Sequence, residues 1–154
     1  MVLSVRAVAS LLPLVALSAA FGASGQTASG GQRSIRDGVF TTEQARRGQA
    51  AYTGPCDRCH GFKLDGAPDD PDMLPAPPVA GPKFLRRWDS RTLATLFEYV
   101  RTTMPTNNPG YLDGAEVADI VAYMLSVSGL PAGGEALSKE PEALASIVIV
   151  SQSP

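Results

Sequence analysis

The chain has 154 residues, 44% of them hydrophobic and 18% charged, a length that suits one small domain rather than two. Acidic residues outnumber basic ones by 15 to 13, which gives a formal net charge of −2. Because phosphate binding requires a basic surface, this composition argues against a nucleic-acid partner.

Residues 1–25 have the pattern of a secretory signal peptide. Residues 1–6 carry one positive charge, 7–21 are almost wholly apolar, and small residues follow at 23–25. An uncleaved anchor is the alternative, but Pro13 interrupts an apolar run that is already shorter than the roughly 20 residues that span a bilayer. We therefore expect an exported, periplasmic protein without a membrane span after cleavage.

The first helix is predicted to follow a flexible leader at 26–38, which is rich in Gly, Ser and Gln. Thr41 and Gln44 have the spacing of a capping box, in which Thr41 caps the helix and Gln44 reaches back. The helix should run to about Tyr52. Gly48 should lie on its inward face, where a small residue lets another helix approach closely.

A cysteine–histidine motif follows this helix at 56–60, with the sequence Cys-Asp-Arg-Cys-His. Two cysteines at this spacing, followed at once by histidine, are the attachment pattern of a c-type haem. Each thiol adds to a vinyl group of the porphyrin, and the imidazole reaches the iron. We therefore predict one covalent haem c on Cys56 and Cys59, with His60 as an axial iron ligand.

Other uses of the motif fit less well. Structural zinc usually takes four thiolate or imidazole ligands, and the chain has only two cysteines and one histidine. A redox dithiol belongs between a strand and a helix of a βαβ unit, an alternation that this sequence lacks. A structural disulfide is the remaining alternative, and export would protect it from reduction.

Residues 61–82 are predicted to form a long ordered loop, because they contain six prolines and no helical period. Such a loop in a small domain is usually functional, and wrapping the edge of a flat cofactor would explain it. Asp65, Asp69, Asp70 and Asp72 also suggest calcium binding, but we favour a solvated acidic turn.

A second helix is predicted from Asp89 or Ser90 to Met104, because apolar residues recur there at steps of three and four, and Pro105 ends it. A third helix should begin at a capping pair at 113 and 116 and end near Gly129. The tail at 132–154 contains four consecutive β-branched residues at 147–150, which favour an extended segment. It should lie across the body or meet a partner chain.

A methionine is the expected sixth iron ligand, because the chain has no second histidine. Met1 would leave with the signal peptide, and Met73 lies in the proline-rich loop close to the motif. Met124 falls on the buried stripe of the third helix and is most simply a packing residue. Met104, at a helix end before a proline, is therefore predicted to bind the iron. The alternative is a core methionine and an open iron.

An ordered series of motifs over about 40–130 resembles a class I monohaem cytochrome c. The series consists of the motif at 56–61, the segment at 77–84, the Met104-Pro105 pair and the segment at 120–125. It is similar to bacterial periplasmic cytochromes that accompany dehydrogenases, often quinoprotein alcohol dehydrogenases. The resemblance implies an all-α cytochrome c fold at 39–131. Three to five helices would surround one covalent haem, with long ordered loops and an extended tail.

The resemblance also implies roles for single residues. The carbonyl of Pro77 would accept a hydrogen bond from His60, with Pro78 as the near alternative. Trp88 would lie near a haem propionate, although a buried core tryptophan fits nearly as well. Family members often have leucine where Val79 stands. The exposed haem edge would lie beside Arg58, Lys63 and the segment 106–111.

Electron transfer is the function that these features favour, because histidine and methionine together saturate the iron. The protein would be a carrier and not an enzyme, either free or as the cytochrome subunit of a dehydrogenase. Its partners would be a periplasmic dehydrogenase and an oxidase or another cytochrome. The alternatives are a haem enzyme or gas sensor with an open iron site, and a non-haem binding module held by the two cysteines.

Overall fold

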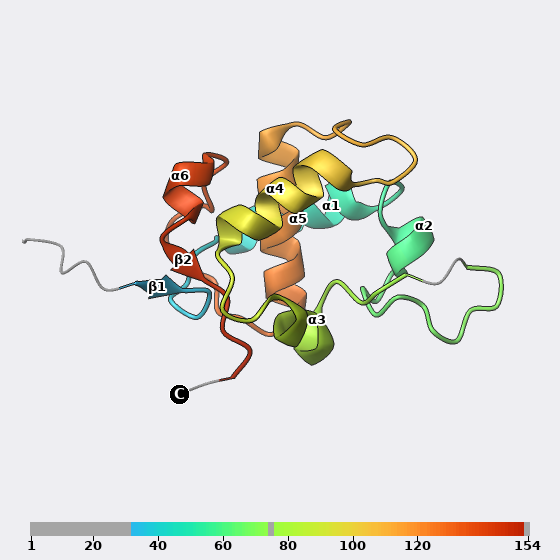
Figure 1. Cartoon of the computed structure of the whole chain (residues 1–154), viewed down its shortest axis with the longest axis horizontal. Coiled ribbons are helices and arrows are strands. Elements are labelled where there is room, and N and C mark those ends of the chain that lie inside the picture. Colours follow the sequence, from blue (N-terminus) through green and yellow to red (C-terminus); the bar gives the residue numbers. More distant parts are fainter. Residues whose placement is uncertain (1–31, 74–75, 153–154) are drawn as a thin grey trace, which may run out of the picture. The chain divides into compact units, whose positions relative to one another are not determined.

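A computed structural model describes residues 32–73 and 76–152. The signal peptide expected at 1–25 lies outside the described residues. Within them, the helices are α1 (Thr42–Tyr52), α2 (Asp57–His60), α3 (Gly81–Trp88), α4 (Leu93–Thr103), α5 (Gly114–Val127) and α6 (Pro141–Leu144), and the strands are β1 (Arg33–Ser34) and β2 (Ile147–Val148) (Figure 1). The predicted all-α class is confirmed. None of these helices combines the length and apolar character needed to cross a membrane.

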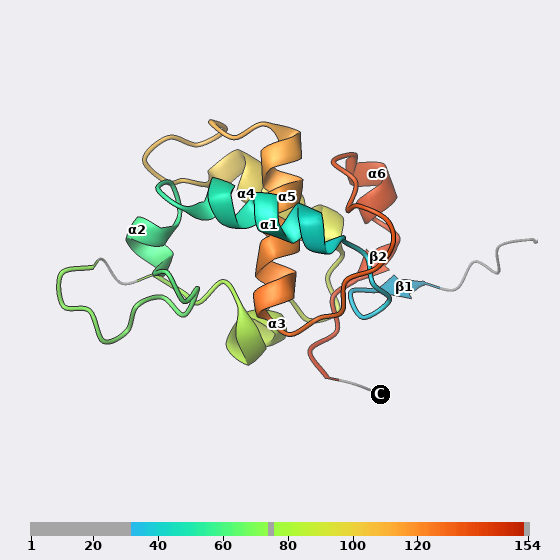
Figure 2. The ribbon, with the colours of Figure 1, turned by 180° about the vertical axis from the view of Figure 1, so that it is seen from behind.

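Helices α1 and α5 cross each other at the centre of the domain (Figure 2). Gly48 lies at the crossing, and a Cβ atom there would overlap the backbone carbonyl of Asp119. The carboxylate of Asp119 accepts two hydrogen bonds from the Arg47 guanidinium, at 2.8 and 2.9 Å. Next to it, the rings of Tyr52 and Tyr123 meet edge to face with centroids 5.6 Å apart. The predicted close approach at Gly48 is therefore confirmed.

The capping box predicted for α1 is only half present. Thr41 Oγ1 accepts a hydrogen bond from the Gln44 backbone N–H at 3.1 Å, as expected. The Gln44 side chain does not reach back but is buried against the tail. There its amide donates to the carbonyl of Leu137 at 2.9 Å and accepts from the N–H of Leu137 at 2.6 Å. The glutamine therefore joins α1 to the tail instead of closing its own cap.

The second predicted helix corresponds to α4, but its start at Asp89 or Ser90 was placed too early, and α3 before it was not predicted. Ser90 has a φ of +63°, a left-handed conformation that interrupts helical geometry. Helix α4 starts after Thr92, whose Oγ1 accepts from the N–H of Thr95 at 3.3 Å. Helix α5 begins with the predicted capping box of Asp113 and Glu116.

The predicted leader and domain boundaries also need correction. Strand β1 pairs in parallel with β2, and Ile35 beside it is fully buried, so the segment at 33–37 belongs to the fold. The tail is equally integrated: Ile149 donates to the carbonyl of Arg91 and accepts from the N–H of Ser90, both at 2.8 Å. The buried apolar side chains of the tail are Leu137, Leu144, Ile147 and Ile149. The domain therefore extends beyond 39–131 at both ends, because its core needs these side chains.

Replacing Gln44 tests the link between α1 and the tail. Gln44→Ala removes both partners of the buried Leu137 backbone groups, so the free energy of unfolding should fall by about 1–3 kcal/mol. Denaturant unfolding of the purified holoprotein measures this, with the exposed Gln49→Ala in the same helix as the control. Equal unfolding midpoints for the two variants would contradict the assignment.

Candidate haem site

The backbone around the Cys-Asp-Arg-Cys-His motif is fixed by hydrogen bonds to both of its flanks. The carbonyl of Cys56 accepts from the N–H of Cys59 at 3.1 Å and from that of His60 at 2.9 Å, which closes the turn of α2. Asp57 is buried, and its carboxylate accepts from the N–H of Gly54 at 3.0 Å. The motif therefore presents both thiols and the imidazole from one short, rigid helical turn.

Tyr52 ties this turn to α1. Its hydroxyl donates to the carbonyl of Gly61 at 2.9 Å, and the side chain is buried. Burial raises the pKa of the Tyr52 hydroxyl well above its usual value, so the group stays protonated and keeps donating. Gly61 itself has a φ of +74°, which favours glycine at the exit from the motif.

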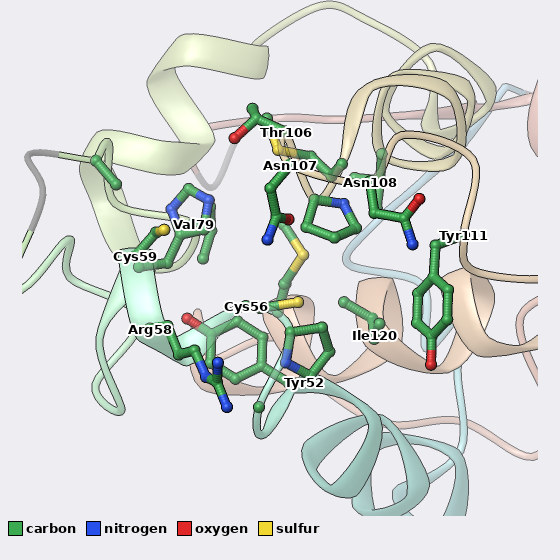
Figure 3. A pocket seen from close by; sticks show the side chains of 18 of the residues that line it. Tyr52, Cys56, Arg58, Cys59, Val79, Thr106, Asn107, Asn108, Tyr111 and Ile120 are labelled. Atoms are coloured by element: carbon green, nitrogen blue, oxygen red, sulfur yellow. The ribbon is translucent and has the colours of Figure 1, made fainter.

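The motif opens onto a cavity of about 590 Å³. This volume falls within the range of about 300–1,000 Å³ that is typical of cofactor pockets. In Figure 3, Cys59 and Val79 lie on one side of it, and Asn108 and Tyr111 lie on the other. Its mostly apolar lining comes from α1, α2, α4, α5 and three connecting loops: Tyr52, Gly54, Pro55, Cys56, Arg58, Cys59, His60, Ala76, Pro77, Val79, Val100, Met104, Pro105, Thr106, Asn107, Asn108, Tyr111, Ile120 and Met124.

The imidazole of His60 is oriented by the proline-rich loop. Its Nδ1 lies 2.8 Å from the carbonyl oxygen of Pro77, the partner expected from sequence in preference to Pro78. Because a carbonyl only accepts, Nδ1 carries the proton and Nε2 is left as the ligating nitrogen. The loop is held in turn by Leu64, whose carbonyl accepts from the N–H of Val79 at 2.8 Å and from that of Ala80 at 3.2 Å.

Two methionines line the cavity. Met104 ends α4, where its N–H donates to the carbonyl of Val100 at 3.0 Å, and it is partly buried. Met124 is buried on α5, one helical turn after Ile120, which lines the same cavity. Met73 is not among the lining residues. The sequence interpretation of Met124 as a core residue missed this position, although its spacing from Ile120 places both side chains on one face of α5.

The thiols do not have the character of a redox pair. Burial, helped by the nearby charge of Asp57 and by Cys59, raises the pKa of the Cys56 thiol to about 11. Reactive dithiols have lowered pKa values, because the thiolate is the nucleophile. The raised pKa of the Cys56 thiol therefore argues against a reactive dithiol.

The donor set of the cavity fits a covalently attached haem. Two thiols, one imidazole with a fixed tautomer and two thioethers line one mostly apolar space. Two thiols separated by two residues suit two thioether links to a porphyrin. Imidazole and thioether are both ligands of haem iron in cytochromes. Apolar walls suit the flat ring.

Comparison with known proteins identifies the family. Residues 43–124, more than half of the chain, match the family described as cytochrome c oxidase, cbb3-type, subunit III. The chain belongs to this family. Its cytochrome c domain carries haem c, and Cys56, Cys59 and His60 supply the attachment motif. No curated protein and no solved structure matched the chain.

Trp88 is buried in α3. It is not among the described residues that line the cavity, and its expected place near a haem propionate stays a prediction. Its ring meets that of Tyr99 edge to face at 5.4 Å, and the Arg91 guanidinium lies 5.5 Å from the ring centroid. Its burial agrees with the core tryptophan that sequence offered as the alternative. The apolar pattern of α3 directs its side chain inward together with Phe84 and Leu85.

The acidic loop shows turns and no metal cluster. Asp65 and Asp70 each accept a hydrogen bond from the backbone N–H two residues later, at 3.0 Å. Among the residues that the structure describes, no group of three or more histidine, cysteine, aspartate or glutamate side chains is arranged to hold a metal ion. This agrees with a solvated acidic turn.

Sequence reasoning did not assign several cavity residues. Val100 and Ile120 were expected only as core, and Asn107 and Asn108 were noted only as part of the segment at 106–111. The segment's position directly after Met104 was the available signal. Arg58 and this segment both line the cavity, which agrees with the haem edge expected beside them.

Replacing the cysteines tests covalent attachment. The double variant Cys56→Ala/Cys59→Ala should carry no haem mass after denaturation, because no thiol remains to form a thioether link. Mass spectrometry of the denatured protein measures this, and Lys63→Gln, just outside the motif, should retain one haem as the wild type does. A double variant that keeps a covalent haem would exclude these cysteines as the anchor.

Proposed function

We propose that the protein is an exported, periplasmic electron carrier that holds one haem c between His60 and Met104. One observation carries the proposal: the only two cysteines and the only histidine of the chain line the same apolar cavity as Met104. The family is that of a haem-based electron-transfer domain, which supports the same role.

Each side chain has a distinct task in this proposal. Cys56 and Cys59 would anchor the porphyrin, and His60, through Nε2, and Met104 would hold the iron. When bound, haem c supplies the iron that takes up and releases one electron. The Pro77 carbonyl fixes the tautomer and the orientation of the His60 ring through the hydrogen bond at Nδ1.

Met104 is preferred to Met124 as the ligand because of its place in the fold. It follows the last residue of α4, is partly buried and leads into the exposed segment at 106–111. Met124 is 97% buried in the last turn of α5, and its helix is fixed by the crossing with α1. A partly buried methionine adapts its side chain to an iron more readily than one locked in a core.

The lining of the cavity favours a carrier over an enzyme or gas sensor. No carboxylate and no imidazole other than His60 are among the described residues that line it. The hydroxyl of Tyr52 is already engaged by Gly61. Acid–base catalysis at a haem needs a positioned proton donor or acceptor. Apart from the side chains of the motif, which include Arg58, and the exposed Tyr111, the described lining residues offer no such group.

The partners proposed are a dehydrogenase as donor and an oxidase or another cytochrome as acceptor. The family description names a subunit of an oxidase, which supports the acceptor end of this route. Arg58 and the exposed segment at 106–111 border the cavity and would face the partner. A contact confined to this rim is small, as suits a transient redox encounter.

Export rests on residues 1–25, and N-terminal sequencing of the purified protein tests cleavage.

Paired methionine variants separate ligation from packing. Met104→Ala should lower the reduction potential and let added imidazole bind the iron, because a thioether ligand favours the reduced state. Met124→Ala should keep the thioether–iron absorption band and lose about 2–5 kcal/mol of unfolding free energy, as expected for a buried methionine. Potentiometry, visible spectra and denaturant unfolding measure these effects. A thioether–iron band that survives in Met104→Ala and disappears in Met124→Ala would reverse the assignment.

A further inference from the structure

Helix α3 presents a basic face on an acidic chain. Its outward side chains include Lys83, Arg86 and Arg87, and Arg91 follows three residues after its end; all four are exposed. The spacing of three and four residues places the helical members on one side. The ion pairs found within 32–73 and 76–152 involve other arginines, at 46, 47 and 101. The basic face therefore remains available for contact with another molecule.

The basic face lies at the other end of α5 from the segment at 106–111, which borders the haem cavity. The N–H of Gly81, the first residue of α3, donates to Oγ of Ser128 at 2.9 Å, just after the end of α5. The segment at 106–111 precedes the start of α5. Helix α5 has 14 residues, a length of about 20 Å at the usual rise per residue. Figures 1 and 2 both show α3 and this segment at opposite ends of α5.

Arginine predominates on the face, which favours carboxylates as its ligands. Guanidinium groups form paired hydrogen bonds with carboxylates, and a rigid helix fixes their spacing. The carboxylate of Asp89, the residue after α3, is engaged by the hydroxyl of Ser90 at 3.2 Å and the N–H of Ser151 at 2.6 Å. A lipid surface fits less well, because the apolar side chains of α3 point into the core and the chain as a whole is acidic.

We infer that the basic face of α3 binds an acidic face of a partner protein while the opening of the haem cavity stays accessible. This inference goes beyond the proposed electron transfer, since it assigns a second contact surface, distinct from the rim formed by Arg58 and the segment at 106–111. Such a surface holds the cytochrome on a partner by salt-sensitive attraction and leaves its redox contact free.

Binding of an oligoglutamate peptide to the holoprotein tests the inference. The variant Lys83→Gln/Arg86→Gln/Arg87→Gln should bind the peptide at least about tenfold more weakly than the wild type at low salt, as expected from three exposed charge contacts. The matched control Arg33→Gln/Arg46→Gln/Arg101→Gln removes the same charge from other exposed positions and should bind like the wild type. Arg91 stays unchanged because it packs on Trp88.

Amide chemical shifts should locate the peptide. In the wild type, shifts should change at 81–91 and stay constant at 106–111. Equal loss of binding in both variants would show that peptide binding depends only on the net charge of the protein, and it would overturn the inference. Binding to phosphatidylglycerol vesicles but not to the peptide would assign the face to a membrane. Self-association that only the α3 variant abolishes would assign it to a second copy; either result overturns the inference. Binding is measured without electron transfer, so its failure leaves the proposed redox role intact.

Discussion

Covalent attachment at two thiols that are separated by two residues requires that one short turn hold both sulfurs and the imidazole in fixed positions. The surroundings of α2 meet this requirement from three directions. Tyr52 fixes the exit of the turn through Gly61, Asp57 fixes its entrance through Gly54, and the Pro77 carbonyl fixes the ring of His60. The contacts of Tyr52 and Pro77 join the motif to α1 and to the proline-rich loop, so the site depends on both of these segments.

The crossing of α1 and α5 supplies the rigid frame behind this turn. Gly48 lets the two helices approach to backbone contact, and the same pair carries Tyr52 and Ile120 to the cavity. The tail closes the opposite side of the domain, through Gln44 and through pairing with the segments at 33–35 and 90–92. Most of the buried apolar side chains lie outside the cavity, so the scaffold has a core of its own.

Local patterns predicted the parts of the molecule that depend on neighbouring residues. The motif spacing gave the attachment site, and the capping box of Asp113 and Glu116 gave the start of α5. Contacts between distant segments were harder to predict. Gln44 carries the pattern of a local cap, but a buried partner 93 residues away competes for its amide.

The errors in element boundaries have the same cause. Helix α3 is short and follows a proline-rich loop, so its period was too brief to recognise before the break at Ser90. Strand β2 had no visible partner because β1 has only two residues and lies in a segment of flexible composition. Resemblance predicts Trp88 near a haem propionate, and its burial beside Tyr99 and Arg91 follows from the inward face of α3.

The visible spectrum of the purified wild-type protein tests the central claim most directly. A haem held by His60 and Met104 should give a reduced c-type α band that carbon monoxide does not change. The oxidised protein should show a weak thioether–iron band that persists at low concentrations of imidazole. An oxidised spectrum without that band, together with immediate binding of carbon monoxide by the reduced protein, would show an open iron and contradict the account.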